Sequence, residues 1–179
     1  MMAAPVRTLL LVLVGLSCSG PVWAEQTQSL KAVISWTGSG RVMQIGTDVA
    51  EFLGALKGIM YVETSEGQLN EAFIECTAKQ ILEGGSRTSI SGNCGIVISG
   101  EDTVYATYQC AGQQGACSGR FTLTEGTGKF KGISGESPMT LRSPLRHLAR
   151  GLQGLETITV SHGVIILSDL SYSVPGGSR

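Results

Sequence analysis

One stretch, residues 119–137, restricts the fold of this chain more than any other part of its sequence. It reads GRFTLTEGTGKFKGISGES, and apolar Phe121 and Leu123 alternate in it with polar threonines. A glycine turn begins at Gly126, and a return strand is expected to start at Phe130. Alternation on both sides of a glycine turn is typical of a β-hairpin, and glycine inside a strand is typical of a bend. The stretch therefore predicts an antiparallel β-protein, and it indicates nothing about chemistry.

The rest of the chain repeats short apolar–polar alternations between glycine-rich turns. Residues 29–36 are predicted to form a strand with Trp36 on its apolar face, followed by a turn at residues 38–40. Near the end, residues 155–160 and 163–168 are predicted to form two separate strands. Eight to ten strands can be counted, and no segment reads as a dependable long helix. With 25 glycines and 15% charged residues, this pattern favours an up-and-down barrel or a β-sandwich.

The first 24 residues have the features of a signal peptide. Arg7 is followed by an apolar run, and Val22, Trp23 and Ala24 form a small-x-small cleavage site. Cleavage after Ala24 would leave residues 25–179, which are predicted to form one domain. We therefore expect a secreted or periplasmic protein. A lipoprotein acylated at Cys18 is the less favoured alternative, because Gly15 stands where such sites usually have leucine.

The charge of the chain argues against a nucleic-acid partner, and its hydropathy argues against a membrane-spanning helix. The chain has 13 basic and 14 acidic residues, so it lacks the basic field that nucleic-acid binding requires. Every apolar run is also shorter than the roughly 20 residues that a membrane-spanning helix needs. We expect neither nucleic acid as a partner nor a membrane span.

Four cysteines remain after signal cleavage: Cys76, Cys94, Cys110 and Cys117. An even number of cysteines in an exported chain predicts disulfides. Three pairings are open, and we favour Cys110–Cys117 across a local loop and Cys76–Cys94 between neighbouring strands. A four-cysteine zinc site is disfavoured because the chain has no C-x-x-C pair.

The segment G-T-G-K-F-K-G-I-S-G, residues 126–135, resembles the G-T-G-x-F-x-G-x-x-G hairpin of the allene oxide cyclase and dirigent-protein barrels. The segment is also similar to exported bacterial proteins of unassigned function. The resemblance covers residues 103–137. It implies an antiparallel eight-stranded, calycin-like barrel, often assembled as a homotrimer, with a cavity for an apolar or aromatic small molecule and no metal or nucleotide cofactor. It carries over no catalytic residue, and the four mature cysteines depart from the plant proteins.

Four residues are candidate ligand contacts: Trp36, Tyr105, Tyr108 and Arg120. The two tyrosines are three positions apart, so an unbulged strand sends them to opposite faces and only one can line a cavity. Arg120 shares the polar face of its strand with two threonines, and it reaches an interior ligand only if that face points inward. Alternation alone leaves the inward face undetermined.

Three functions remain open. The favoured one is a non-catalytic module that binds a small apolar or amphipathic molecule inside the barrel. The second is a cofactor-free cyclase or isomerase, which predicts a buried carboxylate or arginine with a perturbed pKa. The third is a structural or interaction barrel whose core is filled with side chains. The two histidines, His147 and His162, lack metal-ligand spacing, so no metal site is expected.

Overall fold

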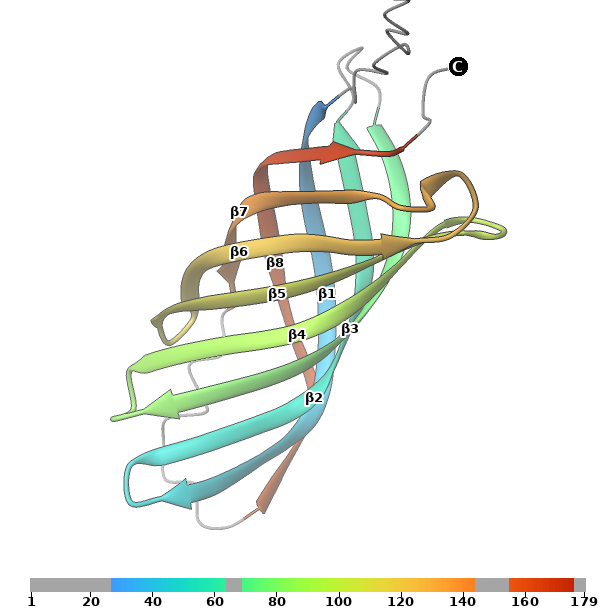
Figure 1. Ribbon diagram of the computed structural model, residues 1–179. Coiled ribbons are helices and arrows are strands. Elements are labelled where there is room, and N and C mark those ends of the chain that lie inside the picture. The colour runs from blue at the N-terminus through green and yellow to red at the C-terminus, as the bar shows by residue number, and fades with distance from the viewer. Residues whose placement is uncertain (1–26, 64–68, 144–154, 176–179) are drawn as a thin grey trace, which may run out of the picture.

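The chain folds into a closed β-barrel in which each strand pairs antiparallel with the next and the last returns to the first (Figure 1). The computed structural model describes residues 27–63, 69–143 and 155–175. The strands are β1 (Gln28–Gly46), β2 (Val49–Glu63), β3 (Leu69–Glu83), β4 (Arg87–Ser99), β5 (Asp102–Gln113), β6 (Ala116–Gly126), β7 (Ser134–Arg142) and β8 (Leu155–Ser173). The predicted all-β, antiparallel eight-stranded barrel is confirmed, and the sandwich alternative is excluded.

Alternating side chains fill the barrel. In β1, Ala32, Ile34 and Trp36 point inward and are buried, whereas the residues between them are exposed. The other strands contribute Phe121, Leu167 and further apolar side chains to one hydrophobic core. Burial of each large apolar side chain stabilises the fold by about 1.5–3 kcal/mol, so this inward face defines the fold.

The structure differs from the sequence-based expectation at the glycine pair 38 and 40. A turn was expected there, but both residues lie inside the continuous strand β1, where Gly40 pairs with Gly54 of β2. A Cβ atom on Gly40 would come within 2.5 Å of the Phe52 ring. The predicted turn is wrong because these glycines make room for a core side chain.

Two strand boundaries also differ. Residues 155–168 belong to one strand, β8, rather than two, because the hydroxyl of the polar Ser161 is satisfied inside the barrel by the Gly38 carbonyl. The return strand after residue 126 begins at Ser134 instead of Phe130. A short 3₁₀ turn, η1 (Gly128–Phe130), and Gly132 at φ +79° occupy the intervening residues.

The glycine motif that dominates the sequence joins two hairpin tips, which lie side by side in Figure 1. Asp102, at the start of β5, accepts a hydrogen bond from the Lys129 backbone N–H (3.0 Å) and pairs with the Lys129 ammonium (3.0 Å). Thr127 donates its hydroxyl proton to the Glu101 carbonyl. Gly128 has φ +56°, and a Cβ atom there would meet the Asp102 carboxylate at 2.1 Å. The motif therefore has a structural role, as a clasp between the β4–β5 tip and η1.

Both favoured disulfide pairings are confirmed. Cys76 of β3 bonds Cys94 of β4, directly opposite in register, and Cys110 of β5 bonds Cys117 of β6. All four cysteines belong to the buried core. Each bridge ties two neighbouring strands together, so the two bridges brace the β3–β6 part of the barrel.

Some predictions concern residues outside the described ranges. The signal peptide over residues 1–24 and the alternative acylation site at Cys18 lie there, as does His147. Among the residues that the structure describes, no helix has the length and hydrophobicity to cross a membrane.

Candidate functional site

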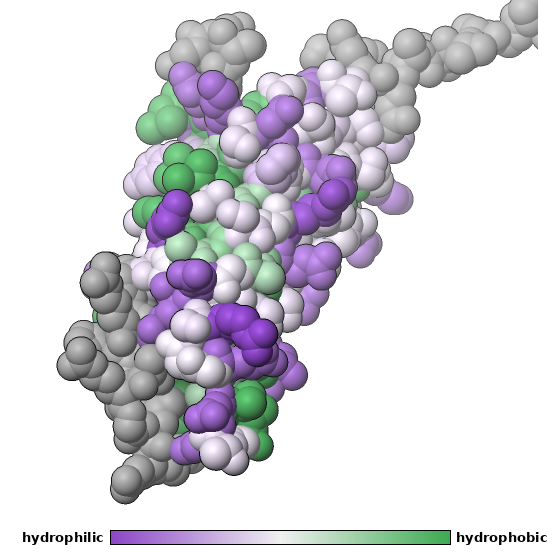
Figure 2. All heavy atoms as spheres, turned by 90° about the vertical axis from the view of Figure 1, so that its left-hand side faces the viewer, coloured by the Kyte–Doolittle hydropathy of each residue, from purple (hydrophilic) through white to green (hydrophobic). Residues whose placement is uncertain are grey.

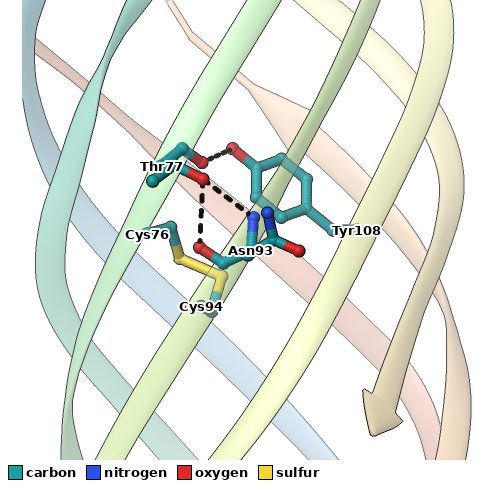
Figure 3. Close-up of a disulfide and its surroundings, with 5 residues drawn as sticks. All are labelled: Cys76, Thr77, Asn93, Cys94 and Tyr108. Atoms are coloured by element: carbon teal, nitrogen blue, oxygen red, sulfur yellow. Dashed lines mark hydrogen bonds between the residues drawn. A yellow bond between two sulfur atoms is a disulfide. The ribbon is translucent and has the colours of Figure 1, made fainter.

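The core around Tyr108 is closed by a network of hydrogen bonds (Figure 3). The β3–β4 ladder pairs Cys76 with Cys94 and resumes only at Lys79 and Ser91. In this interruption the Tyr108 hydroxyl donates to the Thr77 carbonyl oxygen at 3.0 Å, and the Asn93 N–H donates to the Thr77 hydroxyl at 3.1 Å. The phenol therefore takes the acceptor that the ladder leaves unused.

Glycine at position 92 permits this arrangement. A Cβ atom on Gly92 would lie 1.9 Å from the Thr77 carbonyl oxygen and 2.7 Å from the Tyr108 ring. Tyr108 is only 2% exposed, and burial raises the pKa of its hydroxyl. The neutral phenol is a fixed part of the core, so it offers neither a base nor an open contact to a ligand.

A second polar region of the interior lies around Trp36, at the end of the barrel where the β5–β6 turn at Gly115 is found. A cavity of about 30 Å³ remains there. Its lining is formed by apolar side chains and by a few polar ones, namely Trp36, Phe52, Leu56, Ala78, Gln80, Thr88, Ile90, Gly115, Ala116, Leu141, Ser143 and Ser161. This volume accommodates one or two water-sized molecules and no larger organic ligand.

The outer surface of β3–β6 carries much larger depressions. Two adjoining hollows, of about 620 and 650 Å³, share Lys79, Ser91, Gln109 and Arg120 in their lining. We call them together the outer groove. These four residues form one row across the strands, because Lys79 pairs with Ser91, Ser91 with Gln109 and Gln109 with Arg120. Three strand spacings separate the two ends of this row by roughly 14 Å.

The lining of the outer groove is polar but locally neutralised. Hydroxyl and amide side chains dominate it: Thr77, Ser91, Asn93, Thr107, Gln109 and Thr122. Its two cations have carboxylate partners, since Lys79 pairs with Glu51 at 2.9 Å and Arg120 pairs with Glu136. The groove therefore offers hydrogen-bond donors and acceptors without a strong net field.

The four residues predicted to contact a ligand do not form one site. Trp36 and Tyr108 are inward and buried, whereas Tyr105 is 43% exposed on the outer face. Arg120 also points outward, with 58% of its side chain exposed. The expectation that only one of the two tyrosines faces inward is confirmed, and that residue is Tyr108. Ligand contact by these four residues stays a prediction.

Several polar residues escaped the sequence-based prediction. Gln80 donates to the Thr88 hydroxyl at 2.9 Å beside Trp36, and Ser161 donates to the Gly38 carbonyl at 3.0 Å. The position of Gln80 gave some signal, since this residue interrupts the otherwise apolar inward face of β3. What the sequence did not show is that residues from β3, β4 and β8 meet at one end of the barrel.

The described core contains no carboxylate, lysine or arginine; its buried polar side chains are Thr88, Ser137 and Ser161, together with Tyr108. The buried carboxylate or arginine that the cyclase hypothesis predicted is thus not found among the described residues. In the same part of the chain, no group of three or more His, Cys, Asp or Glu side chains is arranged to hold a metal ion.

Exposed hydrophobic residues also cross the outside of the barrel. Ile59, Phe73 and Val97 pair in one row across β2, β3 and β4, and each is more than one third exposed. On the face drawn in Figure 2, hydrophobic residues likewise lie in patches among polar ones. The trimer implied by the sequence resemblance stays a prediction, and such strips are where it would be tested.

Comparisons with known proteins give little further information. No family model and no curated protein matches the sequence. Among solved structures, a pterocarpan synthase dirigent protein aligns over 88% of this chain and 99% of its own, with 12% sequence identity and a TM-score of 0.29. This similarity is too low to assign a family, and the barrel topology is instead established by the strand pairing of the chain itself.

Proposed function

We propose that this protein is an exported, non-catalytic binding module whose ligand occupies the outer groove rather than the barrel interior. The observation that supports this proposal is the contrast in space: about 30 Å³ remains beside Trp36 inside the barrel, against about 620 Å³ in one hollow of the groove. Within the described residues, the geometry thus favours the filled-core alternative over a ligand held in the core. The two buried disulfides fit the oxidising compartment that the predicted signal peptide implies.

The chemistry of the groove favours an uncharged, hydroxyl-rich ligand. An anion would have to displace Glu51 or Glu136 from its cation, and a cation would meet Lys79 or Arg120. Hydroxyl and amide side chains at strand spacing can instead exchange hydrogen bonds with a chain of hydroxyl groups. A neutral oligosaccharide has this chemistry, and a row of roughly 14 Å would hold several sugar units.

Isothermal titration calorimetry with maltoheptaose, cellohexaose and chitohexaose tests the proposal. The groove variant replaces two exposed residues of the central strand β5, Thr107→Ala and Gln109→Ala. The matched control, Ser35→Ala with Thr37→Ala, removes two exposed polar side chains from β1, outside the groove. Loss of two hydrogen bonds of about 1 kcal/mol each predicts at least tenfold weaker binding in the groove variant only.

Two results would contradict the proposal. Equal affinity of the groove and control variants would place the ligand elsewhere. Binding of an apolar molecule with none of the oligosaccharides bound would return support to the ligand-in-barrel hypothesis. Both variants alter exposed residues, so circular dichroism is expected to show an unchanged fold.

A further inference from the structure

Trp36 fits into the core between two glycines of the neighbouring strands. In register it faces Gly58 of β2 and Gly163 of β8. A Cβ atom on Gly163 would come within 2.4 Å of the indole ring, so only glycine there leaves room for the ring. The side chain is 5% exposed, and its indole N–H has no hydrogen-bond partner among the residues that the structure describes. A buried donor without an acceptor is destabilising by about 1–3 kcal/mol.

Trp36, which carries this unpaired donor, lines the cavity of about 30 Å³. Its other polar residues are already engaged with the protein, because Gln80 donates to Thr88 and Ser161 donates to the Gly38 carbonyl. The hydroxyl oxygens of Thr88 and Ser161 keep lone pairs that can accept a further hydrogen bond. Among the described residues, none that lines the cavity is charged.

We propose that this cavity is a binding site for one solvent-sized, neutral hydrogen-bond acceptor, which receives the Trp36 indole N–H. Neutrality follows from the uncharged lining, because a buried ion without a counter-charge is strongly disfavoured. The acceptor is required by the indole N–H, and the size limit is set by the volume. Water and a small alcohol share this chemistry. The site is distinct from the outer groove, which lies on the opposite face of the barrel wall, although Ala78 and Ile90 belong to both linings.

Nuclear magnetic resonance of ¹⁵N-labelled protein, purified with its disulfides intact, tests the proposal. Cleavage after Ala24 would leave Trp36 as the sole tryptophan, and the Trp36→Phe spectrum assigns its indole signal in any case. If water is the occupant, the indole proton shows a cross-peak to a long-lived water molecule. If a small alcohol can occupy the site, methanol shifts the indole signal until the site is saturated, while the backbone amide signals stay in place.

A cavity-filling variant serves as the control. Ala78→Leu adds three carbon atoms to a buried residue of the lining, and it is expected to abolish both the water cross-peak and the methanol-induced shift. The wild-type spectrum is decisive even if this variant fails to fold. An indole proton with neither a water cross-peak nor a methanol response would overturn the proposal, and so would a hydrogen bond from it to a protein group.

Discussion

Tyr108 and Trp36 are both inward aromatic residues with one polar atom, and both have a glycine beside the ring. Among the described residues, however, only the Tyr108 side chain finds a hydrogen-bond partner. In a closed barrel the ladder uses nearly all backbone acceptors. An inward donor can therefore reach a carbonyl only where the ladder is interrupted. At the β3–β4 interruption, the Thr77 carbonyl accepts a hydrogen bond from Tyr108. At the β1–β8 irregularity, the Gly38 carbonyl accepts a hydrogen bond from Ser161 and not from Trp36.

The surroundings of Tyr108 form a structural region of the core, whereas those of Trp36 form a candidate binding site. Around Tyr108, hydrogen bonds and the Cys76–Cys94 disulfide close the core. Around Trp36, an unpaired donor and a cavity remain. Changes near Tyr108 should thus act on stability alone, whereas changes near Trp36 should also alter what the barrel holds.

The largest effect is expected from the disulfide beside Tyr108. On the chain-entropy model, its separation of 18 residues gives about 3 kcal/mol of stabilisation, and the separation of 7 between Cys110 and Cys117 gives about 2 kcal/mol. Urea denaturation of Cys76→Ala/Cys94→Ala and of Cys110→Ala/Cys117→Ala measures both. If the Cys110→Ala/Cys117→Ala variant were the less stable of the two, loop length would not account for the contributions of the two bridges.

Tyr108→Phe should lower the free energy of unfolding by about 1–2 kcal/mol, because the Thr77 carbonyl loses its donor inside the core. Burial raises the pKa of Tyr108, so its contribution is complete below the unfolded value of about 10 and is lost as pH rises above it. Tyr108→Phe should therefore flatten the alkaline loss of stability. Equal curves for wild type and variant between neutral and alkaline pH would refute this role. Tyr105→Phe, on the exposed face, is the control.

Ser161→Ala should cost about 1 kcal/mol, since the Gly38 carbonyl loses its side-chain donor. The same substitution enlarges the space beside Trp36, so the indole fluorescence should change as well. Thermal unfolding and fluorescence emission measure the two effects together. A loss of stability with unaltered fluorescence would show that Ser161 and Trp36 belong to separate regions.

Asp102→Asn is expected to have the smallest effect. Its hydrogen bond from the Lys129 backbone N–H, followed by the interaction with the Lys129 side chain, lowers the pKa of Asp102. A lowered folded pKa gives stability that is present above the unfolded value of about 4 and lost as pH falls below it. Melting temperatures between pH 2 and pH 6 should therefore converge for wild type and variant at the acid end. A constant difference across that range would argue against the clasp.

The sequence predicted those features that depend on local alternation. Phe121 and Leu123 share the inward face, and the alternating residues after Val104 sent Tyr108 and Tyr105 to opposite sides. Cysteine spacing supported the correct pairings. The extent of β8 was missed because Ser161 looked like a break, and its partner, the Gly38 carbonyl, is 123 residues away.

The candidate sites were less predictable than the fold. Period-two alternation does not say which face is inside, so Arg120 remained a candidate for an interior ligand although it points outward. The Trp36 cavity depends on residues of several strands, and the Tyr108–Thr77 bond depends on a ladder interruption that no local pattern marks. Both arise from tertiary packing.

Native mass spectrometry of protein purified from the oxidising compartment, with organic extraction of any bound mass, tests the central claim that the core is filled and the ligand lies outside. We expect a mature chain with two disulfides. Any organic adduct found on the wild type should be absent from the Thr107→Ala/Gln109→Ala groove variant. An adduct larger than solvent, bound equally by wild type and groove variant, would place a ligand in the barrel and contradict the account. The same spectrum reports whether the protein is a monomer or a trimer.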